Sequence, residues 1–241
     1  MASYWQVSRA PRYSLLFALP LLLAYETLAA LQPVGPRGAL RNGADVILET
    51  LFVALAGRWG PLVFMALVIG FGLRLVARDM RAHGGHLRGG VFAGMLVEVA
   101  LLAVVFGTLV GGLTSHVVRP PAAIGASQMA MLGSGTRIML SLGAGIYEEL
   151  LFRVVLVTAL AWLAEGVFGW RPTIAGLWAV LVGATVFSAV HYVGPYGDRL
   201  TVYSFVFRMI AGVFFSALYV MRGFGITAWT HALYDVLLLM V

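Results

Sequence analysis

The chain has 241 residues, of which 61% are hydrophobic and only 11% are charged, and its mean hydropathy is +0.94. Soluble domains carry roughly 25% charged residues, so this composition excludes an ordinary soluble protein and indicates one that lies within a membrane. The formal charge of +6 comes from arginines that are not interleaved with aromatic residues, which disfavours nucleic-acid binding. The chain has no cysteine, which excludes disulfides and thiolate metal sites.

Apolar runs long enough to cross a bilayer core of about 30 Å recur along the whole chain. Because long apolar runs in lipid favour helices, we expect an all-α, polytopic transmembrane helical bundle with about seven or eight membrane segments. Residues 1–241 are expected to form a single membrane-embedded domain. The predicted spans are 13–32, 59–77, 90–113, 136–168, 174–193, 201–221 and 226–241, and the shorter run 46–57 is predicted to be interfacial or re-entrant.

Charge and position indicate how the chain is inserted. A cluster of arginines lies between the second and third predicted spans, and the positive-inside rule places this loop in the cytoplasm. The first apolar run contains Glu26 and is followed by further spans, so we expect it to be a retained anchor and not a cleaved signal peptide. We therefore expect a multi-pass integral protein of a bacterial inner (plasma) membrane.

Two adjacent carboxylates, Glu148 and Glu149, lie within the apolar run 136–168. An ionisable side chain in the hydrocarbon costs at least ~2.5–3.5 kcal/mol on the insertion scale, so such a pair is a functional-site hypothesis by default. Arg153 stands four residues after Glu149 on the same helical face and can neutralise it, whereas no residue so placed pairs with Glu148. We therefore predict a supporting role for Glu149 and Arg153 and a chemical role for Glu148.

Two later apolar runs also carry ionisable side chains. His191 closes the fifth predicted span, and His231 and Asp235 stand four apart on the last predicted helix, so both project from one face. A lone histidine in a membrane is often only an interhelical hydrogen-bonding residue. Three helices with ionisable side chains are harder to explain by packing, because convergence on one cavity lowers their burial cost. We expect Glu148, His191, His231 and Asp235 to share that cavity.

Three motifs carry a family resemblance: Glu-Glu-x-x-x-Arg at 148–153, Phe-x-x-x-His at 187–191 and His-x-x-x-Asp at 231–235. In this order they resemble the motifs of the CPBP family, the intramembrane glutamic endopeptidases related to CAAX prenyl proteases and to bacterial immunity and bacteriocin-processing proteins. The resemblance covers roughly 136–241, the predicted motif core. It implies hydrolysis of a peptide bond near the C-terminus of a membrane-anchored protein or peptide.

The resemblance also implies roles for individual residues. Glu148 and His191 would activate a water molecule, and His231 with residue 235 would stabilise the oxyanion. Family members often have asparagine where this chain has Asp235, and an ionised aspartate would repel an oxyanion. We therefore expect Asp235 either to hold a proton or to orient and charge His231.

Other interpretations of these residues lead to different functions. Two carboxylates and two histidines could bind zinc or a di-metal centre. However, the zincin spacing is absent and Arg153 disfavours a nearby cation, so we expect no metal and no cofactor. A serine nucleophile at Ser127 or Ser134 is disfavoured, because Gly/Ser mixtures are usually loop or packing sequence. A catalytically inactive scaffold or immunity protein of the same fold remains an alternative, as does a small proton-coupled transporter, although the chain lacks repeat halves.

The depth of the histidines sets a geometric condition on this hypothesis. With alternating straight spans, His191 lies about 25 Å along its span, whereas His231 lies about 8 Å from the inner end of the last one. The two histidines would then lie at different depths in the membrane and could not share one site. We therefore expect at least one late segment to be broken, tilted or shifted, either 136–168 or the Gly194-Pro195 region.

Overall fold

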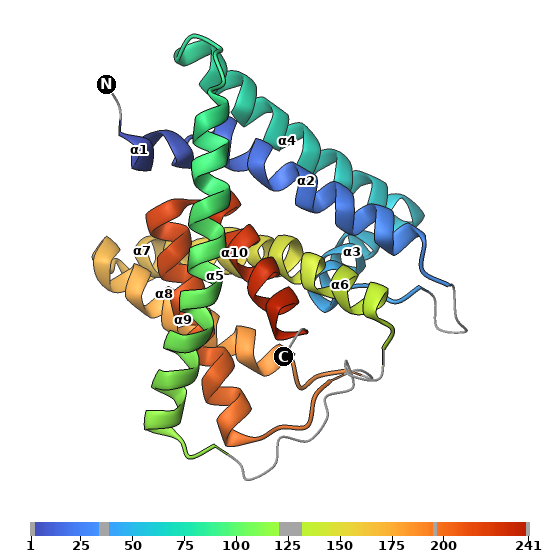
Figure 1. The fold of residues 1–241 in the computed structure, drawn as a ribbon, viewed down its shortest axis with the longest axis vertical. Coiled ribbons are helices and arrows are strands. Elements are labelled where there is room, and N and C mark those ends of the chain that lie inside the picture. The colour runs from blue at the N-terminus through green and yellow to red at the C-terminus, as the bar shows by residue number, and fades with distance from the viewer. Residues whose placement is uncertain (1–2, 34–38, 121–131, 195–196, 240–241) are drawn as a thin grey trace.

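The computed structural model describes residues 3–33, 39–120, 132–194 and 197–239. All regular structure in these ranges is helical, which confirms the all-α prediction (Figure 1). The first half comprises α1 (Tyr4–Arg9), α2 (Pro11–Ala30), α3 (Gly43–Ala56), the 3₁₀ turn η1 (Gly57–Trp59), α4 (Gly60–Ala82) and α5 (Gly89–Val117). The second half comprises α6 (Ser134–Gly143), η3 (Ala144–Glu148), η4 (Leu150–Val157), α7 (Thr158–Phe168), α8 (Pro172–Val190), α9 (Val202–Arg222) and α10 (Phe224–Leu238).

Six helical stretches are long and apolar enough to cross a membrane, which makes this a multi-pass integral membrane protein. They are Pro11–Ala30, Gly43–Ala82, Gly89–Val117, Ser134–Phe168, Pro172–Val190 and Val202–Arg222. The last predicted span, 226–241, corresponds to α10, whose 15 residues fall short of the roughly 20 that a perpendicular span needs. The bundle therefore combines long helices with shorter apolar ones.

The run 46–57, predicted to be interfacial or re-entrant, forms α3. Its 14 residues rise only about 21 Å, less than the ~30 Å of a bilayer core. Gly57 has a φ of 56° at the end of α3, a conformation that favours glycine. The chain then packs closely on itself, because a Cβ at Gly60 would lie 2.4 Å from the Val53 nitrogen. As a result α3 packs against α4.

Local sequence also sets the ends of α8, α9 and α10. Pro172 occupies the first turn of α8, where its missing N–H costs nothing. The Thr201 hydroxyl caps α9 by accepting a hydrogen bond from the Ser204 N–H at 3.1 Å. Gly223, with a φ of 79°, separates α9 from α10 and allows the chain to change direction between them.

The over-long segment predicted at 136–168 is one continuous helical run from α6 through η3 and η4 to α7. Its central part, η3 and η4, is π-helical, a form that is frequent at functional sites. Figure 1 shows this run in yellow, lying across the vertical green α5, so the two are steeply inclined. The segment is therefore continuous and not broken, and it crosses α5 instead of running parallel to it. Pro195, the other suspected position, lies outside the described residues.

The main core lies where α2, η3 and α10 meet. Leu21 and Tyr25 of α2 pack with Tyr147 of η3, all three almost completely buried. Between η3 and α10 the contact is made by small residues, because a Cβ at Gly145 would lie 2.4 Å from the Ala228 carbonyl oxygen. Close approach at glycine and alanine is the usual way in which helices associate in lipid, where hydrophobic burial contributes little. This contact fixes the glutamate motif against the last helix.

Candidate active site

Glu148 lies at the end of η3 and is buried, with 9% of its surface exposed. Its Oε2 atom is 3.8 Å from Nε2 of His191 and 4.0 Å from Nε2 of His231. Its Oε1 atom accepts a hydrogen bond of 2.9 Å from Nδ2 of Asn42. The separations from the histidines exceed a direct hydrogen bond, but both lie within the reach of one bridging molecule. One carboxylate oxygen is thus held by the protein and the other faces both imidazole rings.

His191 immediately follows α8, and its ring is held by the backbone of that helix. Nδ1 donates a hydrogen bond of 2.7 Å to the Phe187 carbonyl oxygen, the partner one turn earlier. Because a carbonyl oxygen can only accept, the hydrogen is on Nδ1, and Nε2 is directed toward Glu148. The Phe187 ring also meets the imidazole edge-on, with ring centroids 4.9 Å apart. The Phe-x-x-x-His spacing therefore fixes both the tautomer and the orientation of His191.

Glu149 and Arg153 form the predicted pair. The Arg153 Nε atom lies 3.2 Å from Glu149 Oε2, and both side chains are almost completely buried. No ion pair within 4 Å joins Arg153 to Glu148, two residues that the structure describes. The guanidinium also lies over the rings of Phe187 and Phe215, at 4.5 and 5.5 Å from their centroids. The angle between Arg153 and Glu149 is not that of a hydrogen bond, so charge and packing hold this pair.

Glu149 makes a second contact that the sequence did not predict. Its Oε1 atom accepts a hydrogen bond of 2.7 Å from Nδ1 of His231. The His231 ring is stacked on Phe215, with centroids 4.2 Å apart and an interplanar angle of 19°. The second glutamate of the motif therefore orients the histidine of the last helix as well as binding Arg153.

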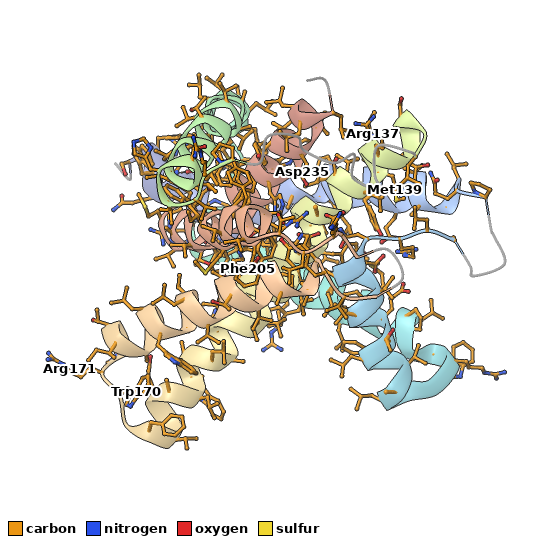
Figure 2. The ribbon with its side chains drawn as sticks, turned by 90° about the horizontal axis from the view of Figure 1, so that it is seen from below. Arg137, Met139, Trp170, Arg171, Phe205 and Asp235 are labelled. Carbon is orange, nitrogen blue, oxygen red and sulfur yellow. The ribbon has the colours of Figure 1, made fainter. Side chains whose placement is uncertain are left out.

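Asp235 lies on α10 (Figure 2), one turn beyond His231. Its side chain is 28% exposed. Its Oδ2 atom is 3.7 Å from Nε2 of His231, too long for a direct hydrogen bond. Of the two roles expected for Asp235, orientation of His231 by direct hydrogen bonding is performed by Glu149. Glu148 lies within 4.0 Å of both histidines, and Nε2 of His231 faces both Glu148 and Asp235.

Asn42 is part of this cluster although sequence reasoning did not select it. It precedes α3, far from the three motifs, and is only 6% exposed. A Cβ at Gly143 would lie 2.8 Å from the Asn42 Cβ, so α6 passes directly against it. The signal present in the sequence was an asparagine in the N-cap position before the short run 46–57, a pattern that predicts a helix start but not a contact with Glu148.

Ser134 and the connection between α7 and α8 lie away from Glu148. Ser134 is exposed at the start of α6, and Ser127 lies outside the described residues. Trp170 and Arg171 lie at the far end of α7 and α8, away from Asp235 (Figure 2). The polar cluster around Glu148 is therefore distinct from the start of α6 and from the α7–α8 connection.

The fold and the site define a multi-pass helical membrane protein in which three late helical segments bring two carboxylates and two histidines together. Residues 134–237 match the family model described as Type II CAAX prenyl endopeptidase Rce1-like. The match covers 104 of 241 residues and includes all three motifs, which confirms the resemblance to the CAAX prenyl protease group of the CPBP family. It supports a CAAX-type intramembrane protease, a peptide hydrolase. No curated protein and no solved structure matches the chain significantly.

Proposed function

We propose that this protein is an intramembrane glutamic-type endopeptidase that hydrolyses a peptide bond near the C-terminus of a membrane-associated protein or peptide. The observation that supports this most is the position of Glu148, whose Oε2 atom lies within 4 Å of Nε2 on two histidines from two other helices. In general-base hydrolysis a side chain takes a proton from the attacking water, and a carboxylate and an imidazole that both contact one water can do this. The family match supplies the class of reaction.

The chemistry begins with a water molecule between Glu148 and His191. Oε2 and Nε2 are 3.8 Å apart, so a water can donate one hydrogen bond of ~2.6–3.2 Å to each. The Nδ1 atom of His191 already donates to the Phe187 carbonyl, which leaves Nε2 as an acceptor in the neutral ring. The water oxygen attacks the carbonyl carbon as Glu148 takes its proton. Glu148 then gives this proton to the leaving nitrogen as the C–N bond breaks.

His231 is proposed to stabilise the oxyanion that forms in this step. Its Nδ1 atom donates to Glu149, and in the charged imidazolium form Nε2 is a second donor. Nε2 lies 4.0 Å from Glu148 Oε2, on the side where the carbonyl oxygen would be placed. Asp235, 3.7 Å from the same nitrogen, would either balance the imidazolium charge or add a donor when it carries a proton.

Metal independence is part of the proposal. Among the described residues no three histidine or acidic side chains are arranged as ligands of one ion. One of the two glutamates is already engaged by His231 and by Arg153, whose buried positive charge disfavours a cation close by. Water activation is therefore assigned to Glu148 and His191 alone.

The test is hydrolysis of membrane-anchored peptides by the purified protein, with and without a lipid on the peptide. Glu148→Gln should lower the rate by about 10²–10⁴-fold, the range that general-base catalysis contributes, without lowering Tm. Glu165→Gln, at an exposed glutamate of α7, is the matched control and should have the wild-type rate. Full activity of Glu148→Gln would contradict the assignment. A wild-type protein inactive on every peptide would favour the inactive scaffold or immunity protein, or the proton-coupled transporter.

A further inference from the structure

Asn42 connects the N-terminal half of the chain to the proposed base. Its Nδ2 atom donates a hydrogen bond of 2.9 Å to Glu148 Oε1, between residues 106 positions apart. Both side chains are buried, and Asn42 lies outside the 134–237 region that matches the family model. A buried hydrogen bond to a charged group is among the stronger polar contacts in a protein.

The orientation of the Asn42 amide is determined by its other contacts. Its Oδ1 atom accepts a hydrogen bond of 2.9 Å from the Ala44 N–H, as the N-cap of α3. Exchanging oxygen and nitrogen would place two donors together at Ala44 and two acceptors together at Glu148, so the amide can be assigned only one way. The backbone N–H of Asn42 also donates to the Tyr25 hydroxyl at 3.0 Å. The donor that faces Glu148 is thus fixed by two further hydrogen bonds of Asn42.

A closed polar network supports this orientation. Tyr25 donates to Asp45 at 2.7 Å, and Asp45 pairs with Arg41. Arg41 in turn binds Glu26 at 2.9 Å, and Glu26 accepts a hydrogen bond from the hydroxyl of Tyr147, the residue before Glu148. The network therefore begins and ends beside the same turn of η3. These contacts fix the position of segment 41–45 relative to the glutamate motif.

We propose that Asn42 is a positioning residue of the active site. It occupies Oε1 of Glu148, so that only Oε2 is directed to the water shared with His191. The inference rests on the proposed function and adds to it that the N-terminal half completes the site. Because Asn42 touches neither the water nor the peptide, its effect is on the orientation and ionisation of Glu148.

The charged and titratable groups around Glu148 determine what a substitution at Asn42 would do. His191 faces Glu148 from the end of α8 and His231 from α10, with Asp235 beyond it. Glu149 and Arg153 lie on the same helical run and neutralise each other. Asn42 is the neutral donor of the set, so a carboxylate in its place would add a like charge beside Glu148 and favour the protonated acid.

The first experiment compares Asn42→Asp with Asn42→Ser in full-length protein. Both substitutions keep an N-cap acceptor for α3, whereas neither donates to Glu148 as the amide does. For Asn42→Asp we expect the acid limb of the kcat/KM profile to move to higher pH, by about one pH unit or more. For Asn42→Ser we expect kcat to fall roughly tenfold to a hundredfold with little change in KM and a smaller shift of the profile. A residue that only caps α3 would leave both the pH profile and kcat of Asn42→Asp unchanged.

The second experiment detects the contact without any activity. Asn42→Asp is introduced into wild type and into Glu148→Gln, and Tm is measured in detergent for the four proteins. The substitution should lower Tm in wild type, where two carboxylates meet. It should lower Tm less, or raise it, in Glu148→Gln, where an amide can donate to the new carboxylate.

The two measurements separate failure of the inference from failure of the proposed function. An equal loss of Tm in both backgrounds would overturn the inference. So would a wild-type pH profile and kcat for Asn42→Asp in an enzyme that otherwise hydrolyses peptides. If wild type hydrolyses nothing, the proposed function fails, and non-additive Tm values would still show that Asn42 holds Glu148.

Discussion

Two ionic clusters among the described residues, one around Glu98 and one around Glu148, differ in how completely their charged groups are hydrogen-bonded. In the first, Arg222 donates to both oxygens of Glu98, at 2.5 and 2.6 Å, and to the Ser8 hydroxyl at 2.9 Å. Tyr4 donates to the same carboxylate at 2.6 Å. Burial and the Glu98 carboxylate raise the pKa of Tyr4 to about 12, so it remains a donor at neutral pH. This cluster joins α1, α5 and α9 and leaves no room for another molecule between its charges.

The second cluster, around Glu148, is held more loosely at its centre. The distances from Oε2 to the two histidines, and from His231 to Asp235, are 3.7–4.0 Å. In addition, Arg153 Nε and Nη1 and Glu149 Oε2 make no hydrogen bond within the described residues. Unsatisfied buried groups in a native protein need an explanation, and a reacting molecule at the centre is one. In the cluster around Glu148 the donors and acceptors face one another without forming direct hydrogen bonds, which is why we propose the active site there and not at Glu98.

The largest expected effects come from removing the arginine of each cluster. Arg153→Ala strands the buried Glu149 carboxylate and should destabilise the protein by about 3–5 kcal/mol, whereas Arg222→Ala strands the partly buried Glu98 and should destabilise it less. Thermal unfolding in detergent would measure this loss. Only Arg153→Ala should also lower the rate per folded molecule, because Arg153 holds Glu149 and Glu149 orients His231.

Glu98→Gln serves as the control for the first cluster, since it removes the charge while retaining the shape. It should destabilise the protein and leave the rate per folded molecule unchanged. An equal loss of rate in Arg222→Ala and Arg153→Ala would remove the distinction between the two clusters.

A smaller effect is expected at Asp235. The side chain is partly exposed and makes no direct hydrogen bond to His231, so Asp235→Asn should leave Tm within a few degrees of wild type. We expect the rate to change by less than about tenfold, because Glu149 already orients His231. Steady-state kinetics on one peptide would measure this. A loss as large as that of Glu148→Gln would show that the aspartate itself takes part in the chemistry.

Prolonged treatment with a chelator should have no effect. Arg153 supplies the buried positive charge of the cluster, and the proposed base and its water need no ion. The same protein assayed before and after chelation should show equal rates, and elemental analysis should find no stoichiometric zinc or iron. Activity lost on chelation and restored by zinc would replace the glutamate mechanism with a metal-dependent one.

The sequence predicted the elements of the site that depend on short spacings. Arg153 follows Glu149 by four residues, and this spacing alone indicated their pairing, which the structure contains. The same reasoning placed His231 and Asp235 on one face of one helix. The long apolar runs predicted the helical bundle because every backbone group in lipid must be satisfied internally.

Other features could not be predicted, because nothing local encodes them. The contact between Asn42 and Glu148 depends on the packing of α3 against η3, across 106 residues of sequence. The π-helical geometry of η3 and η4 has no distinct residue preference, since the same residues form ordinary α-helices. The depth conflict between His191 and His231 came from assuming parallel spans, whereas the 134–168 run is steeply inclined to α5 (Figure 1).

The small-residue contact at Gly145 also has a consequence for motion. Backbone of η3 lies against Ala228 and Ala232 with no space for a side chain between them, so the glutamate motif and the His231 helix move as one rigid body. His191 follows the last turn of α8, and its side chain is 25% exposed, more than those of Glu148 and His231. Within the triangle formed by Glu148, His191 and His231, the His191 corner is thus the most exposed. We expect any change in the distances of this triangle to come from the α8 end, and not from separation of η3 and α10.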